Sequence, residues 1–175
     1  MEDVALGFNG RRAKRIQGYV PFKKAVSIAK QKQPWGHKPH RPITTNFTWL
    51  VYVNVVAGLG VGKKGDVGLY LSPGMALDYF HGVDFFVEYQ GNIATVDISM
   101  YRKDDWKADF LITLEDIQSN RFCDIAHKGI AGCLKRSVER QRILDKEREV
   151  RETWRVASWQ RQKEEEEVKA LLCGA

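Results

Sequence analysis

The segment 82–101, GVDFFVEYQGNIATVDISMY, decides the fold, because it places two apolar-rich runs on either side of a Gln-Gly-Asn turn. This pattern predicts a β-hairpin. A two-residue connection at Gln90-Gly91 or at Gly91-Asn92 gives an antiparallel register in which opposed residue numbers add to 181 or 183. Both registers are compatible with the sequence. Since either sum is odd, both predict the same division of side chains between the two faces of the hairpin.

One face of the hairpin is apolar throughout and is therefore the predicted core face. It collects Val83, Phe85, Val87, Tyr89, Ala94, Val96, Ile98 and Met100. The opposite face carries Asp84, Phe86, Glu88, Thr95, Asp97 and Ser99. In the first register Asp84 lies directly across from Asp97, and in the second the two are diagonal neighbours. We therefore expect these two carboxylates to lie within reach of each other.

Two carboxylates placed so close repel each other, and one pKa rises unless a cation neutralises them. Magnesium is an economical neutraliser, because it prefers oxygen ligands, needs one or two carboxylates and leaves coordination positions for water and phosphate. The pair Asp84 and Asp97 thus indicates a site for Mg²⁺ or Mn²⁺. The alternative is an ordinary amphipathic hairpin whose acidic residues face solvent.

The segments around the hairpin predict both helices and strands. Ser72 as N-cap, Pro73 at the first helical position and Gly82 as a stop predict a short helix. Residues 46–56 read as a strand, with a buried helix as the alternative, and residues 66–71 and 108–114 read as strands. Residues 115–172 are largely helical, with breaks near Gly129 and Gly132. The predicted fold class is α/β (α+β), a small mixed sheet with a central hairpin flanked by helices.

Charge divides the chain into three predicted parts. Residues 1–43 hold ten Lys or Arg and two acidic residues, a net charge of +8, which indicates a basic N-terminal arm. Residues 44–133, the predicted α/β core domain, carry −4, and residues 134–175, the predicted long charged C-terminal helix, carry +2. A basic arm beside an acidic centre favours a polyanionic partner and a bound cation. A solvated tail that serves only solubility is the alternative for the arm.

Other features bear on the compartment and on self-association. Three scattered cysteines indicate a reducing environment, and no segment is apolar and long enough to span a bilayer, so we expect a cytoplasmic, intracellular protein with no membrane partner. Ile143, Val150 and Ala157 recur every seven residues. With Trp154 and Trp159 they predict packing of the C-terminal helix on its own domain or, in a homo-oligomer, on a second copy.

The order of elements over about residues 72–114 resembles the core of the PD-(D/E)XK nucleases. A helix with an acid, Asp78, precedes a strand that begins at Asp84, and the next strand carries Asp97-Ile98-Ser99. That family places an acid at the start of one strand and the pair (D/E)-x-K on the next. The resemblance implies a restriction-endonuclease-like core in which Asp84 and Asp97 are the two acids.

Two positions depart from the family pattern. Val83 stands in place of the proline, and Ser99 stands in place of the lysine. Lysines of this family migrate to neighbouring elements, so Arg102, Lys103 and Lys107 are the candidates for a substitute. We favour Lys107, because it immediately precedes the strand ADFLIT, whose entrance would face the acidic end of the hairpin if that strand pairs beside Asp97.

The resemblance implies metal-assisted hydrolysis of phosphodiester bonds in DNA. Asp84, Asp97 and the backbone carbonyl of Ile98 would hold Mg²⁺ or Mn²⁺, and Lys107 would orient water or neutralise charge in the transition state. Phosphate contacts would come from basic residues of the arm, namely Arg11, Arg12, Lys14, Arg15, Lys23 and Lys24. The alternative function is that of a non-catalytic nucleic-acid-binding or assembly protein, with a viral origin among the candidates for either.

Overall fold

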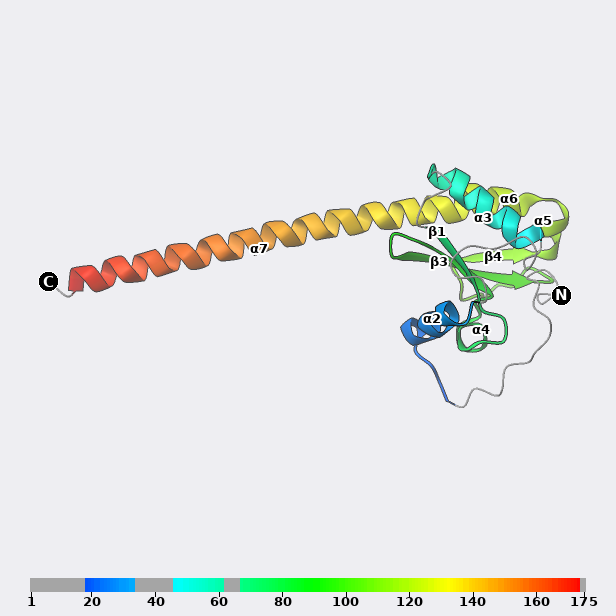
Figure 1. The fold of residues 1–175 in the computed structure, drawn as a ribbon, viewed down its shortest axis with the longest axis horizontal. Helices are drawn as coiled ribbons and strands as arrows, with labels where there is room; N and C mark the ends of the chain where they lie inside the picture. Colours follow the sequence, from blue (N-terminus) through cyan, green and yellow to red (C-terminus); the bar gives the residue numbers. More distant parts are fainter. Residues whose placement is uncertain (1–17, 34–45, 62–66, 174–175) are drawn as a thin grey trace. The chain divides into compact units, whose positions relative to one another are not determined.

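The computed structural model describes residues 18–33, 46–61 and 67–173. The predicted DNA contacts Arg11, Arg12, Lys14 and Arg15 lie outside these residues. The chain forms two compact units, one up to Arg136 and one from Ser137 onward. The first contains a four-stranded sheet with helices on both faces, and the second contains most of one long helix (Figure 1).

The sheet of the first unit is mixed, as predicted. Its strands β1 (Val67–Leu71), β2 (Phe85–Tyr89), β3 (Asn92–Ser99) and β4 (Phe110–Thr113) lie side by side in chain order. The first three are antiparallel, and β4 runs parallel to β3. The pair Phe85–Val96 confirms the hairpin in the register with the sum of 181. Gln90 and Gly91 both have positive φ, as a two-residue type I′ turn requires.

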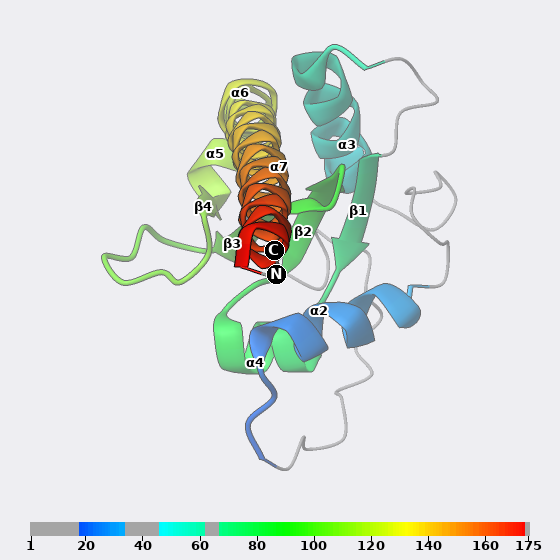
Figure 2. The same cartoon turned by 90° about the vertical axis from the view of Figure 1, so that its left-hand side faces the viewer.

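Two hydrophobic clusters cover the two faces of the sheet. The larger contains Phe85, Val87, Ala94, Val96 and Ile98, as predicted for the core face. The other face is not a solvent face, because α2 (Phe22–Gln31) and α4 (Ala76–His81) pack over it and bury Phe86 completely (Figure 2). Two assignments to the core face were wrong: Val83 lies in this second cluster, and Met100 is exposed.

Residues 46–59 form a helix, α3 (Asn46–Leu59), so the strand prediction was wrong and its alternative is confirmed. Val51, Val55 and Leu59 recur at helical spacing and pack in the larger cluster. The helix packs against the segment Ile125–Ile130, where the absence of a side chain at Gly58 permits close approach. Long, uniformly apolar runs satisfy either a buried strand or a buried helix, and here tertiary packing overrides the β propensity of valine and tyrosine.

The short helix α4 begins later than predicted. Met75 is its N-cap, and Ser72 instead donates from Oγ to the carbonyl oxygen of Val83 at 2.6 Å. The predicted end is confirmed, since Gly82 adopts the left-handed conformation at φ 60°.

After β4 come α5 (Leu114–Gln118), α6 (Arg121–Asp124), a π-helical turn (Ile125–Ile130) and α7 (Ala131–Cys173). The predicted strand near 108–114 is confirmed in β4. The predicted breaks at Gly129 and Gly132 were wrong, because both glycines lie inside helical segments, and the direction of the chain changes at Asn120, with φ 57°.

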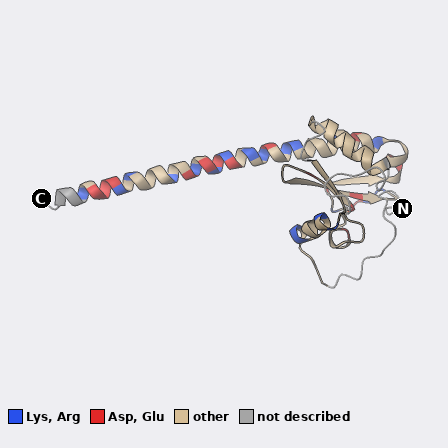
Figure 3. Ribbon diagram, in the orientation of Figure 1, with Lys and Arg blue, Asp and Glu red and all other residues tan. Residues whose placement is uncertain are grey.

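The second unit is the helix α7 from Ser137 onward, whose side chains from 139 to 169 are exposed. Both basic and acidic residues lie along it, and ion pairs one turn apart, such as Arg151–Glu147, form on its surface (Figure 3). Trp154 and Trp159 are both exposed. Packing on a second copy stays a prediction. Within the described parts of the chain, no helix combines the length and apolar character needed to cross a membrane.

Candidate active site

Asp84 is buried immediately before β2, with 3% of its surface exposed. Its side-chain Oδ2 accepts a hydrogen bond from the backbone N–H of Ile98 at 2.6 Å. Its own backbone N–H donates to Val96 O at 2.9 Å, and its carbonyl accepts from Ser72 N at 2.8 Å. The residue therefore joins the start of β2 to β3 and to the turn that precedes α4.

Asp97 is buried in β3, with 6% of its surface exposed. Its neighbour Val96 pairs with Phe85, so Asp97 and Asp84 lie at the same end of the β2–β3 ladder. The hydrogen bond from Ile98, the residue after Asp97, to the Asp84 carboxylate agrees with this placement. The structure thus brings together the two acids that the sequence pattern paired, and it buries them instead of leaving them on a solvated face.

Lys103 forms an ion pair with Asp97. Its Nζ lies 2.7 Å from Asp97 Oδ2, while 42% of the lysine side chain is exposed. It belongs to the connection 100–109 between β3 and β4, where Arg102 and Lys107 are also exposed. Among the ion pairs of the described residues, none joins Lys107 to either aspartate. The structure therefore brings Lys103 to Asp97, whereas the expected cation was Lys107.

The parallel pairing of β4 explains this difference. Val96 pairs with Phe110 and Ser99 with Thr113, so the entrance of β4 lies toward Thr95 and away from the end of β3. Asp109 marks this entrance, because its Oδ2 accepts hydrogen bonds from both the N and the Oγ1 of Thr95 at 2.8 Å. Lys107 immediately precedes this junction. The geometric reason for preferring Lys107 does not hold in a parallel arrangement.

The backbone carbonyl of Ile98 was the third expected metal ligand. In a strand, the N–H and C=O of one residue point toward the same neighbouring strand. Because the N–H of Ile98 points to the Asp84 carboxylate, its carbonyl is directed to the same side of β3. Asp84, Asp97 and this carbonyl therefore all lie at one end of the β2–β3 ladder.

The donor set determines which metals can fit. Over residues 18–33, 46–61 and 67–173, no group of three or more His, Cys, Asp or Glu side chains gathers to hold a metal ion. A metal at Asp84 and Asp97 would have two carboxylates, backbone oxygen and water as ligands. This is a donor set that Mg²⁺ and Mn²⁺ accept and that zinc sites seldom use.

A cleft of about 570 Å³ lies beside the connection 100–109 and is lined by residues of that connection, β4 and the α5–α6 region. Arg102 and Trp106 line it, but neither Asp84 nor Asp97 does. The cleft is therefore separate from the paired acids.

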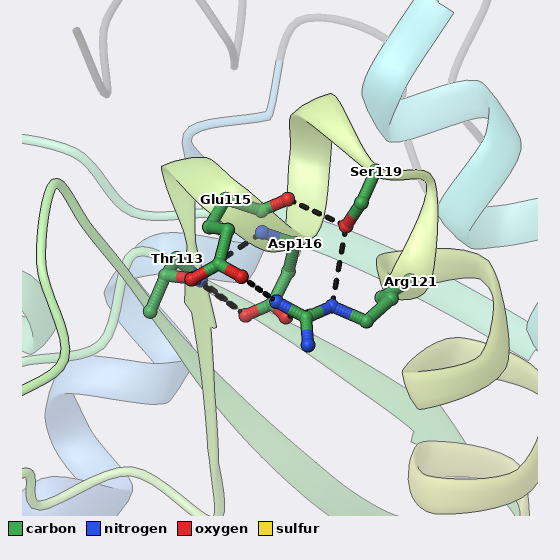
Figure 4. A network of polar contacts seen from close by, with 5 residues as sticks. All are labelled: Thr113, Glu115, Asp116, Ser119 and Arg121. Carbon is green, nitrogen blue, oxygen red and sulfur yellow. Dashed lines mark hydrogen bonds and ion pairs between the residues drawn. The ribbon is translucent and has the colours of Figure 1, made fainter.

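A polar network stiffens the wall of this cleft (Figure 4). Thr113 and Asp116 form a capping box at the start of α5, and Arg121 pairs with Glu115 and Asp116. Burial acts to raise the pKa of Asp116, but hydrogen bonds from the Thr113 hydroxyl and backbone N–H, followed by the charges of Arg121 and Arg102, lower it below its usual value. Asp109 and Asp116 were both missed from the sequence, although each stands at the border of a strand or helix, where capping acids are common.

Lys23 and Lys24, the predicted DNA contacts that the structure describes, are exposed in the first turn of α2. Two other residues fix this helix on the sheet. Lys30 forms an ion pair with Glu88 at 2.6 Å, and the Gln33 side chain exchanges two hydrogen bonds with the backbone of Leu71 in β1. Part of the basic arm is thus an ordered layer of the first unit.

Asp78, the acid of the predicted N-terminal helix, has a local role. Its Oδ2 accepts a hydrogen bond from Gly74 N at 2.7 Å and so closes the turn before α4.

No family model, no curated protein and no solved structure matches the chain.

Proposed function

We propose that this chain is a magnesium- or manganese-dependent nuclease of the PD-(D/E)XK type that hydrolyses phosphodiester bonds in DNA. The observation that carries the proposal is the buried pair of Asp84 and Asp97 at one end of the β2–β3 ladder, with Lys103 2.7 Å from Asp97. Burying two neighbouring carboxylates costs free energy. Binding of a divalent cation by the pair would explain why both acids are buried.

The placement of the acids supports the resemblance found in the sequence. Asp84 lies immediately before one strand and Asp97 lies in the next, as the family pattern requires. Ser99 occupies the position of the motif lysine and carries no charge. Lys103, in the connection 100–109 that follows β3, brings an ammonium group to the Asp97 carboxylate. In this proposal Lys103 takes the part of the migrated lysine that the resemblance implies.

The chemistry follows from these groups. Asp84, Asp97 and the carbonyl of Ile98 would hold the metal, which supplies a nucleophilic hydroxide and stabilises the leaving oxygen when bound. The N–H of Ile98 orients the Asp84 carboxylate, a positioning role that metal ligands commonly need. The partly exposed Lys103 can move from Asp97 to the scissile phosphate and donate a hydrogen bond to an oxygen that gains charge.

A second candidate is a non-catalytic nucleic-acid-binding protein. One observation favours it: Asp84 accepts from a backbone N–H and Asp97 pairs with a lysine, which are the partners that purely structural buried acids have. In that case the two residues only join β2, β3 and the connection 100–109. Metal dependence separates the two candidates.

The test is to incubate the purified chain with supercoiled plasmid DNA and with a single-stranded oligonucleotide, in Mg²⁺, in Mn²⁺ and in EDTA. We expect cleavage with either metal and none in EDTA. The variant Asp97→Asn, purified in parallel to control for host nucleases, should lose cleavage and keep the circular dichroism spectrum and melting temperature of a folded protein. Cleavage by the variant at the rate of the original chain would reject the site.

A further inference from the structure

An aromatic cluster lies where the segment before α2 meets α4. The ring of Tyr19 lies 5.6 Å from that of Phe80 and 5.7 Å from that of His81, measured between centroids. Phe22 contacts His81 edge-on at 5.4 Å, and Tyr79 contacts Phe80 at 5.0 Å. We name these five residues, Tyr19, Phe22, Tyr79, Phe80 and His81, the aromatic platform.

The platform is ordered but open to solvent. Tyr19 is 69% exposed, Tyr79 76% and Phe22 38%. The interface of α2 and α4 with the sheet is filled by other residues, among them Ala25, Ala29 and Leu77. His81 Nε2 lies 2.9 Å from the carbonyl oxygen of Val20, a hydrogen bond that fixes the segment carrying Tyr19. Phe80 packs partly against this cluster, whereas the exposed rings of Tyr19 and Tyr79 are held in place without filling the core.

The charge around the platform is positive. Lys23 and Lys24 directly follow Phe22, and both are exposed. The one carboxylate of α4, Asp78, accepts a hydrogen bond from the backbone of Gly74. In the sequence, four further basic residues precede Tyr19 at positions 11, 12, 14 and 15. Exposed aromatic rings among basic side chains are the composition of surfaces that bind single-stranded nucleic acid.

We propose that the aromatic platform binds single-stranded DNA, with bases stacked on Tyr19 and Tyr79 and with phosphates contacted by Lys23 and Lys24. The inference rests on the proposed nuclease function, and it specifies that the DNA which reaches the paired acids is single-stranded. Duplex DNA does not offer the faces of its bases, whereas a single strand does, and stacking on aromatic rings tolerates any base sequence.

The chain path places the platform close to the paired acids. His81 ends α4, and only Gly82 and Val83 separate it from Asp84. Three residue steps of extended chain span at most about 11 Å. The Cα atoms of His81, at one edge of the platform, and of Asp84 therefore lie within this distance of each other.

The experiment measures binding apart from cleavage. Fluorescence anisotropy of a labelled oligothymidylate is titrated with chains that carry Asp97→Asn, in EDTA, over a series of salt concentrations. We expect Tyr79→Ala and Tyr19→Ala each to raise the Kd about tenfold with an unchanged salt slope, because stacking releases few counterions. Tyr79→Phe, which keeps the ring, should bind as the original chain does.

Two further variants complete the comparison. Lys24→Ala should lower the magnitude of the salt slope by about 0.7, the value for one phosphate contact to a single strand. Trp154→Ala removes an equally exposed aromatic ring from α7 and should leave the Kd unchanged. The proposal would be overturned if neither tyrosine substitution altered the Kd for oligothymidylate. It would also be overturned if a blunt duplex bound more tightly than the single strand.

The outcomes of this test and of the cleavage test are distinguishable. Stacking-dependent binding without metal-dependent cleavage supports the platform and rejects the nuclease. Metal-dependent cleavage with unchanged oligothymidylate binding in Tyr79→Ala and Tyr19→Ala supports the nuclease and rejects the platform.

Discussion

Lys103 Nζ lies 2.7 Å from Asp97 Oδ2, although six positions separate the two residues in the chain. The contact is possible because β4 runs parallel to β3, so the connection 100–109 must return along the sheet to reach the entrance of β4. Lys103 passes Asp97 on this return path. A hairpin between β3 and β4 would not produce such a return, and the contact is therefore a consequence of strand direction.

Lys103→Ala is expected to reduce cleavage far more than Lys107→Ala. A lysine that stabilises transition-state charge affects kcat, whereas one that only holds phosphate affects KM. We expect kcat at saturating DNA to fall about 100-fold for Lys103→Ala and to change less than about threefold for Lys107→Ala. The two exposed lysines of the same connection form a matched pair. Equal kcat values in both variants would remove Lys103 from the mechanism.

Asp84→Asn and Asp84→Ala should differ in stability but not in activity. The asparagine carbonyl can accept the N–H of Ile98 as the carboxylate does, whereas alanine leaves that buried N–H without this acceptor. We expect Asp84→Ala to lower the free energy of unfolding by about 2 kcal/mol and Asp84→Asn by less than about 1 kcal/mol. Both should lose metal-dependent cleavage, because neither retains the charge. Urea unfolding and a plasmid assay measure the two effects.

Other results for the stability and cleavage of these two variants would assign Asp84 a different role. If Asp84→Asn is as destabilised as Asp84→Ala, the negative charge itself stabilises the fold. Retention of cleavage in the stable asparagine variant would exclude Asp84 as a metal ligand.

The hairpin could be predicted closely from the sequence, because local rules specify it. Alternation assigned Phe85, Val87, Val96 and Ile98 to one face, and the Gln90-Gly91 turn fixes the register. The burial of the opposite face could not be predicted in this way. Whether an Asp-bearing face meets solvent depends on which other segment packs over it, and here α2 arrives from the part of the chain that charge alone marked as an arm.

The direction of β4 was another feature that could not be predicted from the sequence. Both a parallel and an antiparallel β4 satisfy the apolar pattern of residues 110–113, and the choice determines which lysine reaches Asp97. The type of element was equally ambiguous for residues 46–59, because an apolar run lacks the periodicity that separates a strand from a helix. These features depend on contacts between distant segments, which local patterns do not encode.

The stability contributed by Asp116 should decline in acid. Its pKa is lowered in the folded protein, so the charged form stabilises the fold above the pKa of the unfolded chain, and this contribution is lost as the pH falls through the lower, folded pKa. At neutral pH we expect Asp116→Asn to lower the free energy of unfolding by about 1 kcal/mol through the capping box. The difference from the original chain should shrink below about pH 4.

Thr113→Ala removes the other member of the capping box and should cost about 1 kcal/mol at neutral pH. Asp124→Asn is the control, because Asp124 is exposed and its ion pair, with Lys128 on the helix surface, joins two exposed side chains. Urea unfolding at several pH values gives all four curves. A difference between Asp116→Asn and the original chain that grows as the pH falls would contradict the assigned direction of the pKa.

Two glycine-to-alanine substitutions should have opposite effects on stability. A Cβ added at Gly58 would lie 2.2 Å from the carbonyl oxygen of His127 and 2.7 Å from the Cβ of Ala131, so α3 must move away from the helical segment that it packs against. Overpacking of this kind costs about 1–3 kcal/mol, more than the roughly 1 kcal/mol that alanine contributes over glycine within a helix. We therefore expect Gly58→Ala to lower the melting temperature.

Gly132→Ala is the matched control, because Gly132 also lies within a helix, α7, yet the nearest atom to an added Cβ is the mobile end of Arg136 at 3.4 Å. Here the helix propensity of alanine should prevail, and the free energy of unfolding should rise by about 0.5–1 kcal/mol. Thermal unfolding followed by circular dichroism measures both variants. A stabilised Gly58→Ala protein would mean that α3 does not approach His127 and Ala131 as closely as described, and that the packing of α3 over the sheet must be revised.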